Sequence, residues 1–174
     1  MKGYHYIKRG IDIILSGMAI VILSPLLLFL CIAIKLDTPG PILFKQKRVG
    51  IHRSFFQIYK FRTMRIDTPK DVPTHMLENP EQYITKVGKF LRKTSLDELP
   101  QIFNIFKGEM SIVGPRPALW NQDDLVAERE KYGANDVTPG LTGWAQINGR
   151  DELEIPDKAR LDGEYVKHLG PWMD

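Results

Sequence analysis

Cysteine, clustered histidine and nucleotide-binding loops are missing or scarce in this chain of 174 residues. Cys31 is its one cysteine and lies in an apolar run, which excludes a disulfide framework and a thiolate metal cluster. The four histidines, His5, His52, His75 and His168, lack the spacing of metal ligands, which argues against zinc. The sequence has no internal repeat and no Gly-x-x-x-x-Gly-Lys loop, which excludes repeat folds and P-loop nucleotide binding.

Acidic residues are also missing from one segment. The length suits one domain with a real core, and 43% hydrophobic and 26% charged residues are typical of globular proteins. No acid occurs between residues 38 and 66, so the net charge of +3 leaves −4 for the rest of the chain. The seven cations of this segment are Lys45, Lys47, Arg48, Arg53, Lys60, Arg62 and Arg65. This asymmetry predicts an anionic partner: phosphate, a lipid headgroup or nucleic acid.

Residues 13–34 lack charged side chains altogether. These 22 residues are rich in Ile, Leu and Val. As a straight helix they would extend about 33 Å, enough for a bilayer core of about 30 Å. The run is too long for a signal peptide and lacks a small-residue cleavage site. A core helix that is apolar all round would need a larger protein to cover it, so we expect membrane contact.

The flanks of this segment favour a helix that enters one leaflet and returns. Lys8 and Arg9 precede it and Lys35 follows it, whereas a single crossing favours cations on the cytoplasmic side only. Ser24 and Pro25 lie near its middle, where proline interrupts the hydrogen-bond ladder and a serine can replace part of it. A kinked ordinary span is the alternative. We therefore divide the chain into a re-entrant membrane helix, residues 1–36, and a membrane-associated domain, residues 37–174, which form one unit.

The pattern of the second part predicts an α+β fold that is mostly helical. Residues 42–49 and 54–62 read as a β-hairpin, and residues 67–80 as a loop. Residues 81–93 form a basic amphipathic segment, which fits a helix on the bilayer surface and a core-packing helix equally well. Further helices are expected at residues 121–132, ending at a glycine, and 156–170, with Trp172 beyond at a membrane interface.

Two adjacent carboxylates, Asp97 and Glu98, stand where another helix is expected to begin. Thr94 or Ser95 could cap this helix. The i, i+3, i+4, i+7 spacing of the apolar residues that follow predicts one buried face. These residues are Leu99, Ile102, Phe103 and Phe106.

This acidic pair has a structural and a chemical interpretation. Ser95 and Glu98 fit a capping box, although Pro100 would then fall beyond the first turn, where it is poorly tolerated. Alternatively, an Asp97 carboxylate kept ionised by nearby cations is a competent nucleophile toward phosphorus. An acid/base hydrolase fits less well, because neighbouring residues on a helix point about 100° apart. The local pattern leaves cap and reactive pair open.

Two arginines are candidates for contacts with phosphate. Arg116 lies between prolines in residues 114–117, and such a stiff loop would aim its guanidinium, although a salt bridge is the alternative. Arg150 ends the glycine-rich residues 138–150. There the glycines either admit a ligand to the backbone or form a tight turn with Trp144 in the core.

Four segments of the chain, taken together and in order, form a pattern that is specific for one protein family. They are residues 60–64 (KFRTM), 92–101 (RKTSLDELPQ), 110–117 (MSIVGPRP) and 139–146 (PGLTGWAQ). In this order they resemble the bacterial sugar transferases, the monotopic phosphoglycosyl transferases, over nearly the whole chain. The resemblance implies transfer of a phospho-sugar from a UDP-sugar to undecaprenyl phosphate, with release of UMP, at the cytoplasmic face of the bacterial inner membrane. This is the first membrane step of surface glycan synthesis.

The resemblance also implies roles for single residues. Asp97 would attack the β-phosphorus and carry the phospho-sugar in a ping-pong reaction, Glu98 would assist, and Mg²⁺, with Asp97 as a ligand, would be required. Phosphate contacts are implied for Arg116 and Arg150, and less strongly for Lys60 and Arg62. The break at Ser24 and Pro25 matches the family's re-entrant helix. Larger members carry a preceding transmembrane bundle that this chain lacks, and the family core usually extends past the point matching Asp174, so we expect a shortened form.

A non-catalytic alternative stays open at this stage. Such a protein would be an adaptor that binds anionic lipid of the inner leaflet through the basic segment. The membrane segment argues against nucleic acid as the partner.

Overall fold

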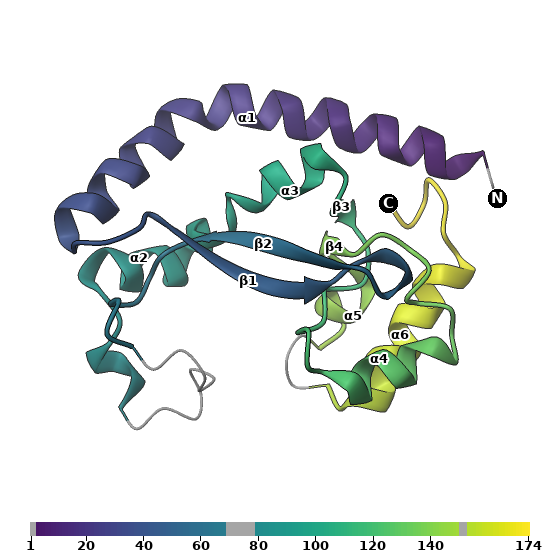
Figure 1. Ribbon diagram of the computed structural model, residues 1–174. Helices are drawn as coiled ribbons and strands as arrows, with labels where there is room; N and C mark the ends of the chain where they lie inside the picture. The colour runs from purple at the N-terminus through teal and green to yellow at the C-terminus, as the bar shows by residue number, and fades with distance from the viewer. Residues whose placement is uncertain (1–2, 69–78, 150–152) are drawn as a thin grey trace.

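The computed structural model describes residues 3–68, 79–149 and 153–174. Its longest element is α1 (Tyr4–Asp37), a helix of 34 residues that arches over the other elements in Figure 1. Beneath it lie α3 (Gln101–Lys107) and the hairpin of β1 (Leu43–Val49) and β2 (Phe55–Phe61). The prediction of a mostly helical α+β fold is confirmed.

Helix α1 continues through Pro25 and is curved (Figure 1). The amide hydrogen that Pro25 lacks would have bonded the carbonyl of Val21, and the Ser24 hydroxyl donates to that oxygen instead, at 2.8 Å. The most apolar 18 residues of α1 have a mean hydropathy of 2.7, and 17% of them are buried within the protein. By length and composition α1 can therefore cross a membrane.

The two halves of α1 are attached in different ways. Its first half has buried polar residues, among them Asp12, which accepts hydrogen bonds from the Ser111 hydroxyl at 2.8 Å and the Ile112 amide at 3.0 Å. Arg9 donates to the carbonyls of Ile105 and Phe106, which satisfies the last turn of α3. The second half packs through apolar side chains on the hairpin and on α2 (Lys86–Thr94), in a cluster of Leu30, Ile34, Phe61 and Leu91.

The predicted β-hairpin is confirmed. β1 and β2 pair antiparallel through the one-turn 3₁₀ helix η1 (Ile51–Arg53), with Arg48 opposite Phe56 and Phe44 opposite Lys60. Directly paired residues share a face, so the strand alternation places Arg48 and Lys60 on the same face. Phe56 and Ile58 of that face pack on Ile105 and Met110 below α1.

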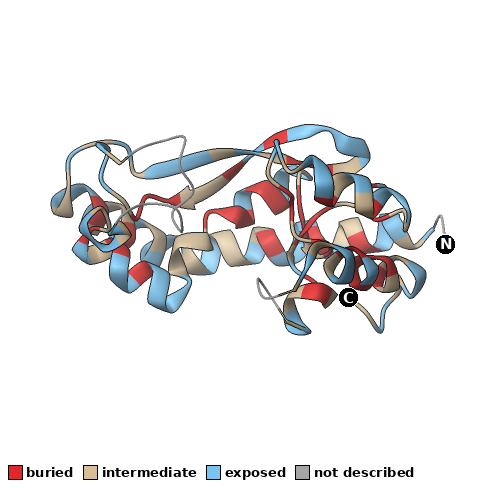
Figure 2. Cartoon of the chain, turned by 90° about the horizontal axis from the view of Figure 1, so that it is seen from below, coloured by how far each residue is buried: buried red, intermediate tan, exposed pale blue. Residues whose placement is uncertain are grey.

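The remaining elements form a second packed group. β3 (Ser111–Val113) pairs in parallel with β4 (Gly140–Thr142). The helix α4 (Asp123–Glu130) lies between these strands in the chain, and α5 (Trp144–Ile147) and α6 (Ile155–Lys167) follow β4. Figure 2 shows buried positions gathered where the helices and the hairpin meet, with the outer turns exposed. The expected helices at residues 121–132 and 156–170 are confirmed within a few residues at their ends, and Gly133 has the predicted left-handed backbone, with φ of 68°.

The helix expected at residues 81–93 is shorter than predicted. Residues Pro80–Gln82 form the 3₁₀ turn η3, and α2 (Lys86–Thr94) begins after Thr85. The Thr85 hydroxyl caps α2 by accepting the Gly88 amide at 2.8 Å. Gly88 lies against the backbone of Thr63, where a Cβ would come within 2.1 Å of the Thr63 carbonyl oxygen. This close packing keeps α2 beside the end of β2.

The predicted start of the helix at the acidic pair is wrong. Ser95 adopts a left-handed conformation, with φ of 58°, and its side chain caps nothing. The pair lies instead on a short 3₁₀ turn, η4 (Leu96–Glu98), and α3 starts after Pro100. The predicted buried face is also wrong, because Phe103 and Phe106 are 39% and 47% exposed. The buried residues of α3 are Gln101, Ile102, Asn104 and Ile105.

Candidate active site

The acidic pair lies on η4 at a bend between α2 and α3. The left-handed Ser95 ends α2, and the buried Pro100 precedes the first turn of α3 without a lost hydrogen bond. Asp97 and Glu98 are both half-buried here. This chain geometry replaces the capping-box interpretation, because neither carboxylate is needed to satisfy a long helix.

Glu98 connects three segments of the chain. Its Oε1 accepts from Lys60 Nζ of β2 at 2.8 Å and from Arg116 Nη2 of the loop after β3 at 2.9 Å. Burial by itself would raise the pKa of Glu98, but Lys60 and Arg116 lower it to about 2. Glu98 is therefore ionised at neutral pH and holds two cations beside Asp97.

Asp97 is placed differently from its neighbour. No other side chain in the described part of the protein hydrogen-bonds its carboxylate. Burial raises its pKa above the usual range, with Glu98 adding to the rise and Lys60 and Arg92 opposing it. The sequence predicted that cations would favour ionised Asp97, whereas in the structure Glu98 takes the direct contacts. Its own backbone amide contributes a hydrogen bond, so Asp97 is a weakly solvated carboxylate whose oxygens are free of other side chains.

The loop that carries Arg116 is braced on both sides. On the β1 side, the amide of Val49 donates to the carbonyl of Ala118 at 2.9 Å, and Arg48 Nη1 donates to the carbonyl of Pro117 at 3.0 Å. On the β4 side, Gly140 donates to Pro115 at 2.9 Å. The rigidity expected from the two prolines is therefore reinforced by neighbouring strands. The salt bridge that was the alternative for Arg116 is present, since it contacts Glu98.

The glycine-rich segment approaches this loop rather than an open space. A Cβ on Gly140 would lie 2.1 Å from the Gly114 amide nitrogen, and one on Gly143 would lie 2.2 Å from the Gly114 carbonyl oxygen. Trp144 is partly buried and donates through Nε1 to Glu164 at 3.1 Å. Close backbone packing accounts for these glycines. It differs from the structural alternative, because residues 140–147 form β4 and α5 rather than a tight turn and Trp144 is only partly buried. Arg150, the predicted phosphate ligand at the end of this segment, lies outside the described residues.

Arg62 does not join Lys60 and Arg116. Its side chain is directed to the turn after α1, where it donates to the carbonyls of Thr38 and Pro39 and to the Thr38 hydroxyl at 2.6–2.9 Å. Arg62 is 6% exposed. Its observed contacts brace this turn, which differs from the phosphate contact that the resemblance implied.

The basic segment does not form one patch. Arg53 pairs with Glu130, Arg65 with Asp67 and Lys60 with Glu98, so acids outside the segment balance three of its seven cations. Lys45 and Lys47 lie over aromatic rings of the hairpin. The structure therefore gives no support to a lipid-binding adaptor that depends on a continuous basic surface.

Two residues that contact β3 or the Arg116 loop have no individual role in the sequence-based predictions. Arg48 belongs to the basic segment, and strand alternation places it on the same face of the hairpin as Lys60. Asp12, which bonds Ser111 and Ile112 of β3, immediately precedes the uncharged residues 13–34. An acid that immediately precedes an uncharged membrane segment is costly unless it is paired, and this signal could have found it.

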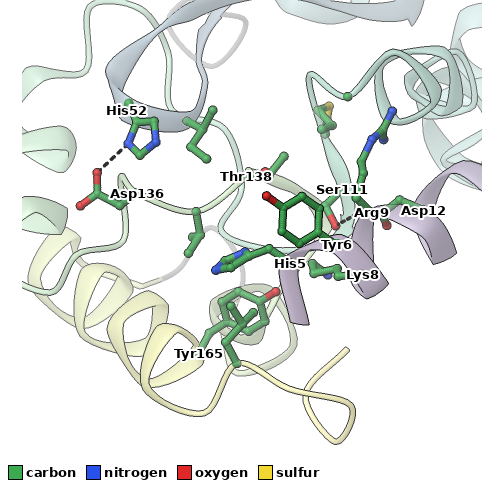
Figure 3. Close-up of a pocket in the computed structure, with 15 residues that line it drawn as sticks. His5, Tyr6, Lys8, Arg9, Asp12, His52, Ser111, Asp136, Thr138 and Tyr165 are labelled. Carbon is green, nitrogen blue, oxygen red and sulfur yellow. Dashed lines mark hydrogen bonds and ion pairs between the residues drawn. The ribbon is translucent and has the colours of Figure 1, made fainter. Parts of the chain in front are cut away.

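One cavity lies away from the acidic pair. Its volume is about 540 Å³, and it opens between the start of α1, the end of α6 and the loops near residues 52 and 137 (Figure 3). Both carboxylates of its lining are engaged: Asp12 accepts from Ser111 and Ile112, and Asp136 contacts His52 at 2.9 Å. The cavity therefore offers no free carboxylate or nucleophile comparable to Asp97.

Comparison with known proteins identifies relatives of nearly the whole chain. A sequence model described as "Bacterial sugar transferase" matches residues 3–174. The chain is 41% identical, over 97% of its length, to the UDP-glucose:undecaprenyl-phosphate glucose-1-phosphate transferase of Escherichia coli K12, and covers 38% of that protein. It is 40% identical, over 96% of its length, to the undecaprenyl-phosphate glucose phosphotransferase of Komagataeibacter xylinus, and covers 33% of it.

A third relative has a different sugar in its name. The chain is 39% identical, over 98% of its length, to the UDP-N-acetylgalactosamine-undecaprenyl-phosphate N-acetylgalactosaminephosphotransferase of Aeromonas hydrophila, and covers 41% of that protein. The chain thus spans between one third and two fifths of the length of these three relatives.

Proposed function

Because the chain belongs to the bacterial sugar transferase family, we propose that it transfers a sugar phosphate from a UDP-sugar to undecaprenyl phosphate. The products are UMP and a polyprenyl diphosphate sugar. The observation that carries this proposal is the pairing of two unlike carboxylates: Glu98 is ionised and holds Lys60 and Arg116, and Asp97 beside it has free oxygens. Phosphoryl transfer depends chiefly on alignment and charge neutralisation, and this arrangement offers both.

The proposed reaction has two displacements at phosphorus. An oxygen of Asp97 forms a bond to the phosphorus that bears the sugar, and the bond from that phosphorus to the bridging oxygen breaks, so UMP leaves with the electron pair. An oxygen of undecaprenyl phosphate then attacks the same phosphorus, and the Asp97 carboxylate leaves. The covalent intermediate lets a soluble donor and a membrane acceptor use one site in turn.

Glu98 has a narrower role in this proposal than general acid or base catalysis. With a pKa of about 2 it is ionised at neutral pH and has no proton to donate. As a base it would have to break its contacts with Lys60 and Arg116. We assign Glu98 to holding these cations where they contact the phosphoryl oxygens of the donor.

Mg²⁺ fits this site as an ion held partly by the substrate. No group of three Asp, Glu, His or Cys residues suited to a metal occurs among the residues that the structure describes. Mg²⁺ is commonly bound through one or two carboxylates and substrate phosphates, and the free oxygens of Asp97 suit such a site. When bound, the ion would offset negative charge on the diphosphate. Arg150 stays a proposed phosphate ligand.

The acceptor is a lipid, so the proposal places Asp97 at the level of the bilayer surface. Exposed apolar residues support this placement. Helix α1 exposes many aliphatic side chains, and Phe90 of α2 and Phe103 and Phe106 of α3 are exposed on the two helices that pack against α1. We propose that α1 enters one leaflet and returns at Ser24 and Pro25, with the site on the cytoplasmic face of the inner membrane and anionic headgroups nearby.

Trapping of the intermediate tests this mechanism. The purified chain in detergent is mixed with a panel of UDP-sugars without acceptor, and its intact mass is measured. We expect one UDP-sugar to add the mass of its sugar phosphate, at a peptide containing Asp97, with release of one UMP per protein. Addition of undecaprenyl phosphate should remove the adduct. If the wild-type protein releases UMP continuously with undecaprenyl phosphate but never carries an adduct, the covalent mechanism is ruled out. If no UDP-sugar leads to release of UMP, the function is ruled out.

A further inference from the structure

Arg48 is a cation of the site that the mechanism above does not use. It ends the face of β1 that also carries Lys60 across the hairpin. Its Nη1 donates to the carbonyl of Pro117, next to Arg116, at 3.0 Å, and its Nη2 donates to Gln46 Oε1 at 2.7 Å. Its Nε is buried and, within residues 3–68, 79–149 and 153–174, has no hydrogen-bond partner. The guanidinium is thus fixed directly behind the loop that carries Arg116.

The charge of Arg48 is not balanced by a direct partner. None of the ion pairs among the described residues includes it. Burial and, to a lesser extent, the positive charge of Arg116 lower its pKa to about 10. Glu98 opposes this shift but already holds two other cations. A half-buried cation beside a second cation is costly, and a neutral side chain could make the same bond to Pro117.

We propose that Arg48 is a positioning residue of the donor site, which stands behind Arg116 and supplies positive charge that the diphosphate of the donor offsets. This inference rests on the proposed function. Arg48, Lys60, Arg92 and Arg116 surround two carboxylates, Asp97 and Glu98, which leaves two positive charges in excess. A UDP-sugar carries one negative charge on each of its two phosphoryl groups. The bound diphosphate therefore offsets the two positive charges that these side chains have in excess, before the charge of a bound Mg²⁺ is counted.

Two substitutions separate the charge of Arg48 from its packing. Arg48→Gln removes the charge and keeps an amide donor toward Pro117, whereas Arg48→Lys keeps the charge. The matched control is Lys47→Gln, which removes one charge from the next residue, on the opposite face of the hairpin, where Lys47 is exposed. The dissociation constant for UDP is measured by calorimetry on the full chain in detergent, together with KM and kcat for the UDP-sugar that the trapping experiment identifies.

We expect Arg48→Gln to weaken UDP binding by about 10- to 100-fold and to raise KM more than it lowers kcat. Arg48→Lys should stay within about threefold of the wild type, and so should Lys47→Gln. The inference is overturned if Arg48→Gln binds UDP within twofold of the wild type, or if Arg48→Lys is as weak as Arg48→Gln. If thermal melting shows that Arg48→Gln does not fold, Arg48→Lys decides. UDP binding within about threefold of the wild type then supports the inference, and binding weakened about tenfold or more overturns it. A wild-type protein that binds no UDP and releases no UMP would instead refute the proposed function.

Discussion

Two groups of buried charges in this protein are built on opposite plans. Between α4 and α6, Arg129 and Asp162 form a pair at 2.7 Å in which the side chains are only 6% and 1% exposed. Around η4, the single carboxylate of Glu98 is shared by Lys60 and Arg116, whose side chains are 19% and 35% exposed. The first group is balanced and closed to solvent, and the second has excess positive charge and is open.

The difference separates a structural ion pair from a binding site. A balanced buried pair needs no ligand, and loss of one partner leaves the other charge buried without compensation. A site with excess cations and partial exposure is suited to an anion that arrives from solution. We therefore expect substitutions in the first group to change stability, and substitutions in the second to change activity.

The largest effect is expected for Asp97→Asn. It should lower turnover by about 10⁴-fold or more, because the amide cannot displace UMP. The folded-state pKa of Asp97 is raised, so the ionised carboxylate destabilises the fold as pH rises above its usual pKa. Thermal melting at neutral pH should therefore show the variant to be at least as stable as the wild type, and a clear loss of stability would assign Asp97 to the structural group.

The converse experiment is Arg129→Met. It should lower the free energy of unfolding by roughly 3–5 kcal/mol in urea titrations, because Asp162 would be left buried without a partner. Burial already raises the pKa of Asp162, and Arg129 opposes this rise. Exchange of both residues, as in Arg129→Met with Asp162→Leu, should recover most of the loss. Turnover per folded molecule, measured below the melting range, should stay within about threefold of the wild type. A raised KM would contradict the assignment of Arg129 and Asp162 to a structural ion pair.

Glu98→Gln tests whether the shared carboxylate holds its two cations. We expect kcat/KM to fall by about 10- to 100-fold, because a neutral amide binds Lys60 and Arg116 more weakly. The pKa of Glu98 is lowered from 4.5 to about 2, so its stabilising contribution is complete above pH 4.5 and is lost as pH falls toward 2. Acid unfolding of the wild type should be steeper in this range than that of the variant, and equal slopes would contradict the assignment.

The smallest functional effect is expected for Arg62→Lys. Its three hydrogen bonds to the turn after α1 predict a loss of about 1–3 kcal/mol in stability, measured by urea unfolding. KM for the UDP-sugar should stay within about twofold of the wild type. A tenfold rise in KM without loss of stability would restore Arg62 as a phosphate ligand.

Local patterns were sufficient for much of the fold. Strand alternation and the turn at residues 50–53 predicted the hairpin, and the uncharged residues 13–34 predicted the long apolar helix, although α1 continues through Pro25 as one curved helix. Gly133 was correctly predicted to end a helix. These features depend on neighbours within a few residues, where periodicity and backbone preferences decide.

The start of α3 shows where such patterns fail. The i, i+3, i+4, i+7 spacing predicted that Phe103 and Phe106 would be buried, but they are exposed on a helix whose buried face includes the polar Gln101 and Asn104. Periodicity assumes that apolar residues avoid the surface, and this assumption fails where the surface is suited to lipid. Asn104 is buried because its side chain bonds the backbone of β2, a contact between residues 45 and 47 positions apart.

Residue patterns alone were enough to predict the strands of the hairpin, the apolar character of α1 and, through the ordered motifs, the family. Folding sets which cations meet the acidic pair: Lys60 and Arg116 contact Glu98 from 38 and 18 positions away, whereas Arg62, two residues from Lys60, faces the turn after α1. The two kinds of interaction differ in range. Backbone preferences act between near neighbours in the chain, but charge pairing and desolvation depend on groups that folding brings together.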